Sequence, residues 1–138
     1  MTIVETLGPL LGGWSGTNRL RLLPTDDFQQ SAATATVSVT ARQFVTVAYT
    51  WSDGDKPQDG LMLIGENGLV WADSWHTPEA WMEFSREPDD GGVVSFSGVY
   101  EKEWGWLIHL EPAAAKITMQ NVPPGQSPYE VVEIALGL

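Results

Sequence analysis

About ten short segments of alternating apolar and polar residues follow one another along this chain. The first begins at a glycine-flanked tryptophan, in Leu11-Gly12-Gly13-Trp14-Ser15-Gly16. Turn residues, rather than helical crossovers, separate the segments, so the sheet is expected to be antiparallel. Closure of such a sheet removes its exposed edges. The sequence therefore predicts an all-β fold with a single closed antiparallel up-and-down barrel of about ten strands.

Clear turn signals separate the expected strands. Asn67-Gly68 between two apolar runs favours a tight hairpin, because a type I′ turn needs positive φ at both central residues. We expect a polar loop over residues 53–60, and a helical turn or a loop over residues 77–80. Residues 2–11 are expected to form a short lead-in helix or turn. The predicted strands cover residues 14–22, 32–41, 43–52, 61–66, 69–75, 81–86, 93–102, 104–110, 116–122 and 129–136.

The composition limits the classes of protein that the chain fits. Its 138 residues suit a single domain, over residues 1–138, with a sizeable core. It has no cysteine, which excludes disulfides and thiolate metal sites. Eighteen acidic and seven basic side chains give a formal charge of −11, which repels nucleic-acid phosphates and anionic lipid surfaces. Without a basic N-terminal signal or a long apolar run, the expected location is the cytoplasm.

Seven tryptophans are a large number for a chain of this length. An indole needs a deep core or a lined cavity, and its N–H needs an acceptor. Most of the seven fall on the apolar face of a predicted strand, so the interior is either completely filled or a cavity walled by rings. The residues expected to contact a ligand are Asn18, Tyr49, Trp51, Trp71, Asp73, Trp75, His76, Arg86, Tyr100, Trp104 and Trp106.

Asp73 is the most informative polar residue in this set. Two-residue spacing places its carboxylate on the same strand face as Trp71 and Trp75. A carboxylate among indoles must be paired or hydrogen-bonded, and Arg86 is the expected partner. Asp73, Arg86 and Asn18 would then orient a ligand. The alternative is a structural role, in which Asp73 accepts an indole N–H or caps a loop.

The two histidines suggest no catalytic triad or metal site. Asp73-Ser74-Trp75-His76 contains the residue types of a hydrolase triad, but strand alternation separates Asp73 from Ser74 and His76. His76 is expected at the rim of the barrel, as a ligand contact, an acid/base group or a plain capping residue. His109 is expected to face outward. No cluster has the spacing of metal ligands, so we expect no metal.

Several motifs resemble known barrels. Gly13-Trp14-Ser15-Gly16 is similar to the G-x-W opening of the calycins, which include lipocalins, fatty-acid-binding proteins and nitrobindin-like haem barrels. The resemblance implies a calycin-like barrel from about Leu11 to Ala135. The chain also looks like a family of small bacterial proteins of unknown function, thought to share this barrel. That likeness rests on Tyr49-Thr50-Trp51, Leu63-Ile64-Gly65, Asp73-Ser74-Trp75-His76 and Trp104-Gly105-Trp106.

The chain also departs from the calycin patterns. Nitrobindin-like proteins carry haem on a histidine late in the chain, and no histidine follows His109 here. This departure counts against haem as the cofactor. Lipocalins typically stack a late arginine on the opening tryptophan, and no arginine follows Arg86.

We therefore expect a non-enzymatic cytoplasmic barrel that binds a small apolar or aromatic molecule, with no nucleic-acid or membrane partner. Two alternatives stay open. One is an enzyme on the same barrel that uses Asp73 and His76 or a bound haem. The other is a filled barrel that acts as an interaction module. The sequence fixes neither the identity of the ligand nor the oligomeric state.

Overall fold

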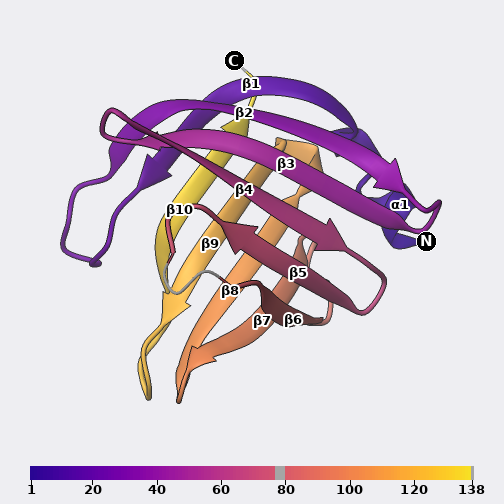
Figure 1. Cartoon of the computed structure of the whole chain (residues 1–138). Coiled ribbons are helices and arrows are strands. Elements are labelled where there is room, and N and C mark those ends of the chain that lie inside the picture. Colours follow the sequence, from indigo (N-terminus) through magenta and orange to yellow (C-terminus); the bar gives the residue numbers. More distant parts are fainter. Residues whose placement is uncertain (77–79, 138) are drawn as a thin grey trace.

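Ten antiparallel strands close into one barrel in the computed structural model, which describes residues 1–76 and 80–137 (Figure 1). Each strand pairs with its neighbours in sequence, and β1 pairs with β10 to complete the cylinder. Helix α1 (Ile3–Thr6) and the 3-10 turn η1 (Gly8–Leu10) precede β1, and a second 3-10 turn, η2 (Pro112–Ala114), follows β8. The strands are β1 (Gly12–Leu20), β2 (Gln29–Thr40), β3 (Phe44–Asp53), β4 (Lys56–Ile64), β5 (Gly68–Asp73), β6 (Met82–Arg86), β7 (Val94–Glu101), β8 (Trp104–Glu111), β9 (Lys116–Val122) and β10 (Tyr129–Leu136).

The predicted all-β barrel and its lead-in are confirmed, but the predicted loop over residues 53–60 is wrong. Strand β4 begins at Lys56, which pairs with Asp53 across a two-residue turn. Gly54 occupies this turn with a φ of +61°, a conformation that glycine adopts without steric cost. The chain therefore reverses at once, and the polar residues after the turn continue the ladder. The predicted turn at 77–80 falls largely on residues 77–79, outside the described residues.

Strand alternation fills most of the barrel interior with apolar side chains. In β2, for example, Ala35 and Val37 are buried whereas Thr34 and Thr36 are exposed. β-branched and small residues suit such a half-buried pleated surface. These buried side chains form one hydrophobic core inside the barrel. The side chains with at most 1% exposure include Val45, Met62, Ile64, Phe96, Ile108, Leu110, Ile117, Met119 and Ile134.

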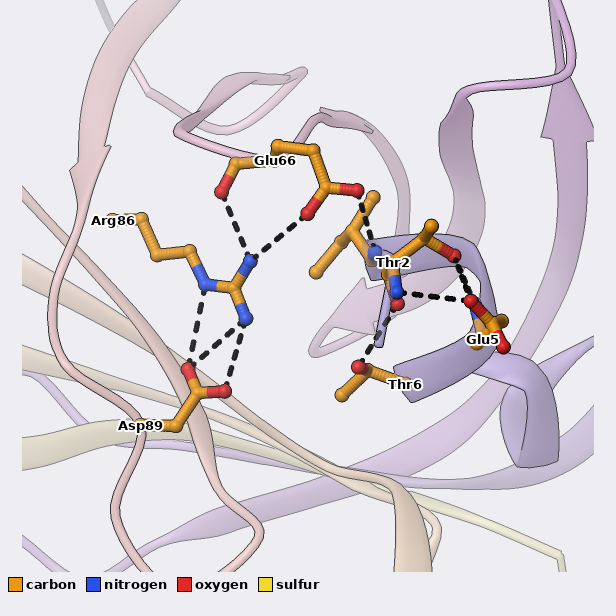
Figure 2. Close-up of polar contacts among 7 residues, drawn as sticks. Thr2, Glu5, Thr6, Glu66, Arg86 and Asp89 are labelled. Carbon is orange, nitrogen blue, oxygen red and sulfur yellow. Dashed lines mark hydrogen bonds and ion pairs between the residues drawn. The ribbon is translucent and has the colours of Figure 1, made fainter.

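The lead-in segment closes one end of the barrel. Ile3, Leu7 and Leu10 are fully buried against the core. Thr2 and Glu5 form a capping box that satisfies the first backbone N–H groups of α1 (Figure 2). Among the described residues, no helix has the length and apolar character needed to cross a bilayer.

Two further contacts hold the lead-in segment in place. The Trp14 indole N–H donates to the carbonyl oxygen of Leu10 at 2.7 Å, so the opening tryptophan ties η1 to β1. The carboxylate of Glu66, in the turn between β4 and β5, accepts the backbone N–H of Ile3 at 2.8 Å (Figure 2). The lead-in segment is therefore anchored near both of its ends, to the β4–β5 turn through Ile3 and to β1 through Leu10.

The closure of the barrel predicts different effects for two neighbouring glycines. A Cβ at Gly16 would overlap the carbonyl oxygen of Ala135 in β10, whereas a Cβ at Gly13 would meet nothing within 4 Å. Gly16→Ala is expected to lower the free energy of unfolding by about 2 kcal/mol, because the two strands must separate. Gly13→Ala, the matched control, is expected to change it by about 0.5 kcal/mol or less. Urea unfolding followed by tryptophan fluorescence measures both, and equal losses would contradict the close approach of β1 and β10.

Candidate functional site

The aromatic residues identified from the sequence gather at the end of the barrel opposite α1. This end is formed by the C-terminal ends of the odd-numbered strands and the N-terminal ends of the even-numbered strands. Trp51 and Trp71 lie near the ends of β3 and β5, and Trp106 lies near the start of β8. Antiparallel order thus brings together rings that are far apart in the sequence.

A cavity of about 1010 Å³ lies at this open end. Its volume is at the upper end of the range for small-molecule sites, roughly 300–1,000 Å³. Residues from the end of β5, the start of β6, the end of β7 and the start of β8 contribute to its wall. The apolar part of that wall includes Leu22, Trp71, Trp75, Met82, Trp106 and Val131.

The cavity extends sideways between β6 and β7. In the described part of the chain these strands share two partner pairs, Ser85 with Ser97 and Arg86 with Phe96. Beyond these pairs, residues 80–83 and 99–101 both line the cavity, and no further pair joins β6 to β7 among the described residues. Trp81 is 69% exposed at this rim. Met82 and Glu83 still pair with β5, and Val99 and Glu101 pair with β8, so each strand lacks a partner here only on the side that faces the other.

Asp73 ends β5 and holds His76. One carboxylate oxygen accepts the backbone N–H groups of Trp75 and His76, at 3.2 and 2.8 Å. Both oxygens lie close to His76 Nδ1, at 2.8 and 2.9 Å. The Asp73 side chain is only 4% exposed, whereas that of His76 is 40% exposed, so the carboxylate is buried while the imidazole reaches the surface. The predicted placement of His76 on the opposite face is wrong, because the strand stops at Asp73 and the turn brings the ring back.

The same turn directs Ser74 away from His76. Its hydroxyl donates to the side-chain oxygen of Gln58 at 2.6 Å and accepts the backbone N–H of Asp59 at 2.9 Å. A Ser–His–Asp chain is therefore not formed, as the sequence predicted, although the predicted reason for its absence does not hold.

The imidazole of His76 is surrounded by indoles. Its centroid lies 4.9 Å from that of Trp71, 5.0 Å from Trp75 and 5.7 Å from Trp106, with steep interplanar angles. Because a carboxylate only accepts hydrogen bonds, Nδ1 carries the proton shared with Asp73. In the neutral ring, Nε2 is then a hydrogen-bond acceptor, and it has no partner among the described residues. His76 lines the cavity and offers this atom to a ligand.

The stacked pair of Trp71 and Trp106 is supported from within the barrel. Their centroids are 5.7 Å apart, with planes 8° from parallel. The Trp71 N–H donates to the Tyr49 hydroxyl at 2.7 Å. Burial raises the pKa of the Tyr49 phenol well above its usual value, so this residue stays neutral. Tyr49, a predicted ligand contact, is 4% exposed and positions Trp71 rather than lining the cavity.

Trp75 is supported in a similar way by the end of β3. Its N–H donates to the carboxylate of Asp53 at 3.1 Å. Trp51 packs edge-to-face on it, with centroids 5.6 Å apart. Trp51 is buried and absent from the cavity wall. The two predicted aromatic contacts from β3 thus form a layer behind the wall.

Tyr100 lies on the other side of the cavity and begins a chain of hydrogen bonds. Its hydroxyl donates to the Asn121 side-chain oxygen at 2.7 Å, and the Asn121 amide donates to Tyr129 at 3.0 Å. Tyr129 donates to the Leu22 carbonyl at 2.9 Å. Desolvation by burial raises the pKa of Tyr100. Trp104 packs near Tyr100 at 6.4 Å but does not line the cavity.

Arg86 and Asn18 lie away from the cavity wall. Arg86 is at the closed end, where its guanidinium binds Asp89 and donates to the Glu66 carbonyl at 2.9 Å (Figure 2). The predicted pair of Arg86 with Asp73 is therefore wrong. Arg86 ends β6 at the closed end of the barrel, whereas Asp73 lies at the open end, where β6 starts at Met82. Asn18 is 1% exposed inside the barrel, and its side-chain oxygen has no partner among the described residues.

His109 faces outward from β8, as predicted. Its neighbours Ile108 and Leu110 are fully buried, so the imidazole lies on the outer face. Nδ1 is 2.7 Å from the Ser95 hydroxyl, and Nε2 is 2.8 Å from the Gln120 side-chain oxygen. Both ring nitrogens are thus occupied. Among the described residues, no three His, Asp or Glu side chains are grouped to hold a metal ion.

Other parts of the cavity wall were not identified from the sequence. They include Leu22 and Val131, which meet because the Arg21 N–H binds the Val131 carbonyl at 3.0 Å. A contact between segments so far apart in the chain gives no recognisable residue pattern near either of them. Met82 was detectable, since it alternates with buried Phe84. Glu83 and Glu101 were missed because, in the sequence, an acidic residue at the cavity rim looks the same as one at any other solvent-exposed strand end.

Comparison with known proteins supports the fold. Neither the protein-family models nor the curated proteins gave a match. Among solved structures, the chain is similar to the crystal structure of Rv2717c from M. tuberculosis, with a TM-score of 0.57 and 16% sequence identity. The match covers 96% of this chain and 94% of that chain. At this identity the likeness shows a shared barrel fold alone.

The contact between Asp73 and His76 predicts the tautomer of the imidazole. The neutral ring of His76 is expected to carry its proton on Nδ1, and Asp73→Ala is expected to release this preference. Ring ¹⁵N chemical shifts in a His109→Gln background, where His76 is the remaining histidine, measure the tautomer. A neutral ring protonated on Nε2 in the parent protein would contradict the arrangement.

The contact between Tyr49 and Trp71 predicts a loss of stability. Tyr49→Phe leaves the buried Trp71 N–H without an acceptor, which is expected to cost about 1–3 kcal/mol. Tyr100→Phe removes a hydroxyl from a more exposed site, where water replaces the lost partner, and is expected to cost less. Urea unfolding compares the two variants, and an equal or smaller loss for Tyr49→Phe would contradict this ranking.

Proposed function

We propose that this chain is a calycin-like barrel of a cytoplasmic bacterial protein, and that it binds a small apolar or aromatic molecule without catalysis. The observation that carries the proposal is the cavity at the open end, which Trp71, Trp75 and Trp106 wall around the imidazole of His76. Flat rings supply a large apolar contact area, and a few fixed polar atoms orient the ligand.

Two polar atoms of the indole and imidazole cluster have no partner among the described residues: Nε2 of His76, an acceptor, and the buried N–H of Trp106, a donor. Asp73 uses its oxygens on His76 and on backbone N–H groups, so it has little capacity left for a ligand. The accessible acceptor is Nε2 of His76. A flat molecule with one O–H or N–H group fits this site, because its ring contacts indoles while its donor meets the imidazole.

A bound haem is supported less well. The late histidine, His109, faces outward with both ring nitrogens occupied, which leaves His76 as the imidazole that lines the cavity. Haem propionates are anionic, and the described residues that line the cavity include three carboxylates and no lysine or arginine. The negative charges of the propionates and of these carboxylates would repel each other. A filled barrel that serves as an interaction module is also less well supported, because the filled interior ends at a cavity of about 1010 Å³.

Acid/base catalysis is a second candidate, favoured by the geometry of Asp73 and His76. An imidazole oriented by a carboxylate can accept a proton from a substrate hydroxyl or amine. Ser74 points elsewhere, so the reaction would be a proton transfer without a covalent serine intermediate. This candidate requires that His76→Ala abolishes turnover while Ser74→Ala preserves it.

Titration with 2-naphthol, a flat molecule with one hydroxyl donor, tests the proposal. Saturable binding is expected to shift the indole N–H signals of Trp71, Trp75 and Trp106 in ¹H–¹⁵N spectra. His76→Ala is expected to weaken binding about tenfold, because a hydrogen bond and a ring contact are lost. His109→Ala, the same change on the outer face, is expected to leave the affinity unchanged. Absence of binding, or equal effects of the two variants, would refute the proposal.

A further inference from the structure

The indole N–H of Trp106 is an unused hydrogen-bond donor in the cavity wall. Trp106 lines the cavity and is 6% exposed, and its N–H has no partner within the part of the chain that the structure describes. Two other indoles of the wall have theirs satisfied. The N–H of Trp71 donates to Tyr49. Asp53 accepts the N–H of Trp75. Folded proteins leave few buried donors unpaired, because each one costs free energy, so the Trp106 N–H calls for a partner from outside the described residues.

An unused acceptor lies beside this donor. The ring centroids of His76 and Trp106 are 5.7 Å apart, and the two planes meet at 81°. Asp73 holds Nδ1 of His76, so Nε2 of the neutral ring is free to accept a hydrogen bond from a ligand. Both His76 and Trp106 line the cavity. One small group on a ligand can therefore contact a donor and an acceptor at the same time.

The side chain of Tyr100 separates the Trp106 ring from the mouth of the cavity. Its ring packs at a steep angle on the indole, with centroids 6.2 Å apart, and it also lines the cavity. Because the N–H of Trp106 is buried, a ligand must shift a neighbouring side chain to reach it. Tyr100 is exposed, so it can turn aside without opening a void in the close-packed core, and water can replace its lost hydrogen bond.

We infer that the ligand carries a donor and an acceptor on neighbouring atoms of a flat ring system, as a cyclic amide does. The N–H of the amide donates to Nε2 of His76, and its carbonyl oxygen accepts the N–H of Trp106. This inference rests on the proposed function, because it names the ligand class of the same cavity.

The same pair of atoms disfavours groups that offer a donor or an acceptor alone. An ammonium group has donors only, so the N–H of Trp106 stays unpaired. A carboxylate has acceptors only, so its oxygens face the lone pair of His76 Nε2. A hydroxyl has one oxygen for both bonds, whereas an amide spreads them over two atoms. Two atoms suit His76 and Trp106 better, because these rings come from the end of β5 and the start of β8.

Three probes with one bicyclic skeleton separate the two hydrogen bonds. Oxindole, a cyclic amide, has both the N–H and the carbonyl group. 1-Methyloxindole keeps the carbonyl acceptor alone, and indole keeps the N–H donor alone. Isothermal titration calorimetry measures the affinity of each probe for the parent protein and for its variants. The quantity compared is the factor by which a variant changes each affinity, since this factor cancels the different hydration of the three probes.

Two variants remove the two protein groups one at a time and keep an aromatic ring in place. Trp106→Phe is expected to weaken binding of oxindole and 1-methyloxindole about tenfold relative to indole, because the carbonyl loses its donor. His76→Phe is expected to weaken binding of oxindole and indole about tenfold relative to 1-methyloxindole, because the N–H loses its acceptor.

Trp75→Phe is the matched control. It changes the same wall in the same way as Trp106→Phe, but the N–H that it removes is already used by Asp53. It is therefore expected to change the affinities of the three probes by one common factor.

A measurement on the parent protein does not depend on the folding of any variant. The indole proton signal of Trp106 in ¹H–¹⁵N spectra is expected to move downfield on saturation with oxindole or 1-methyloxindole, because a hydrogen bond to a carbonyl oxygen deshields the proton. Saturation with indole is expected to produce no such downfield shift.

The outcomes separate the inference from the proposed function. If Trp106→Phe or His76→Phe changes all three affinities by one factor, or if the Trp106 signal does not distinguish the carbonyl probes from indole, the inference is overturned while binding of small aromatic molecules stands. The same holds if 2-naphthol binds and none of the three probes does. If 2-naphthol also fails to bind, the proposed function fails, and the inference fails with it.

Discussion

The pairing of β1 with β10 is the constraint on which the rest of the structure depends. It joins the first and last strands into one continuous hydrogen-bonded cylinder, so neither of them is left as an unpaired edge. It also fixes the register, because Gly16 passes so close to Ala135 that a side chain has no room there. In a closed sheet, a slip of one residue would turn a whole strand inside out. The positions of the rings at the open end therefore follow from contacts made elsewhere in the barrel.

One end of the cylinder is sealed and the other holds the cavity, because different residues lie at the strand ends on the two sides. At one end, the lead-in segment buries Ile3, Leu7 and Leu10 and seals the core. At the other end, the barrel is lined by indoles instead of aliphatic side chains. Asp73 lies among these indoles, at the last position of β5. One carboxylate both stops β5 and fixes the orientation of His76. The polar centre of the cavity is thus a product of how a single strand ends.

Much of the fold was predictable from period-two alternation, because each strand has one face in the core. The cavity was less predictable, since its residues depend on long-range register. Trp71, Trp75 and Trp106 were identified, and they line the wall together with Asp73, His76 and Tyr100. Arg86 was misplaced because alternation gives the face of a side chain but not its height in the barrel. The position of His76 was missed for a different reason: the periodic pattern does not reveal that the strand stops at Asp73.

The short contact between β6 and β7 has a consequence for how the protein moves. Among the described residues two partner pairs join these strands, whereas β3 and β4 pair along almost their whole length. Local opening costs the least free energy where few backbone hydrogen bonds and little buried surface must be given up. Fluctuations should therefore concentrate along this seam, on a timescale much faster than global unfolding. Such opening leaves the remaining strands paired as a cylinder, so local motion at the seam and a stable fold are compatible in the same small protein.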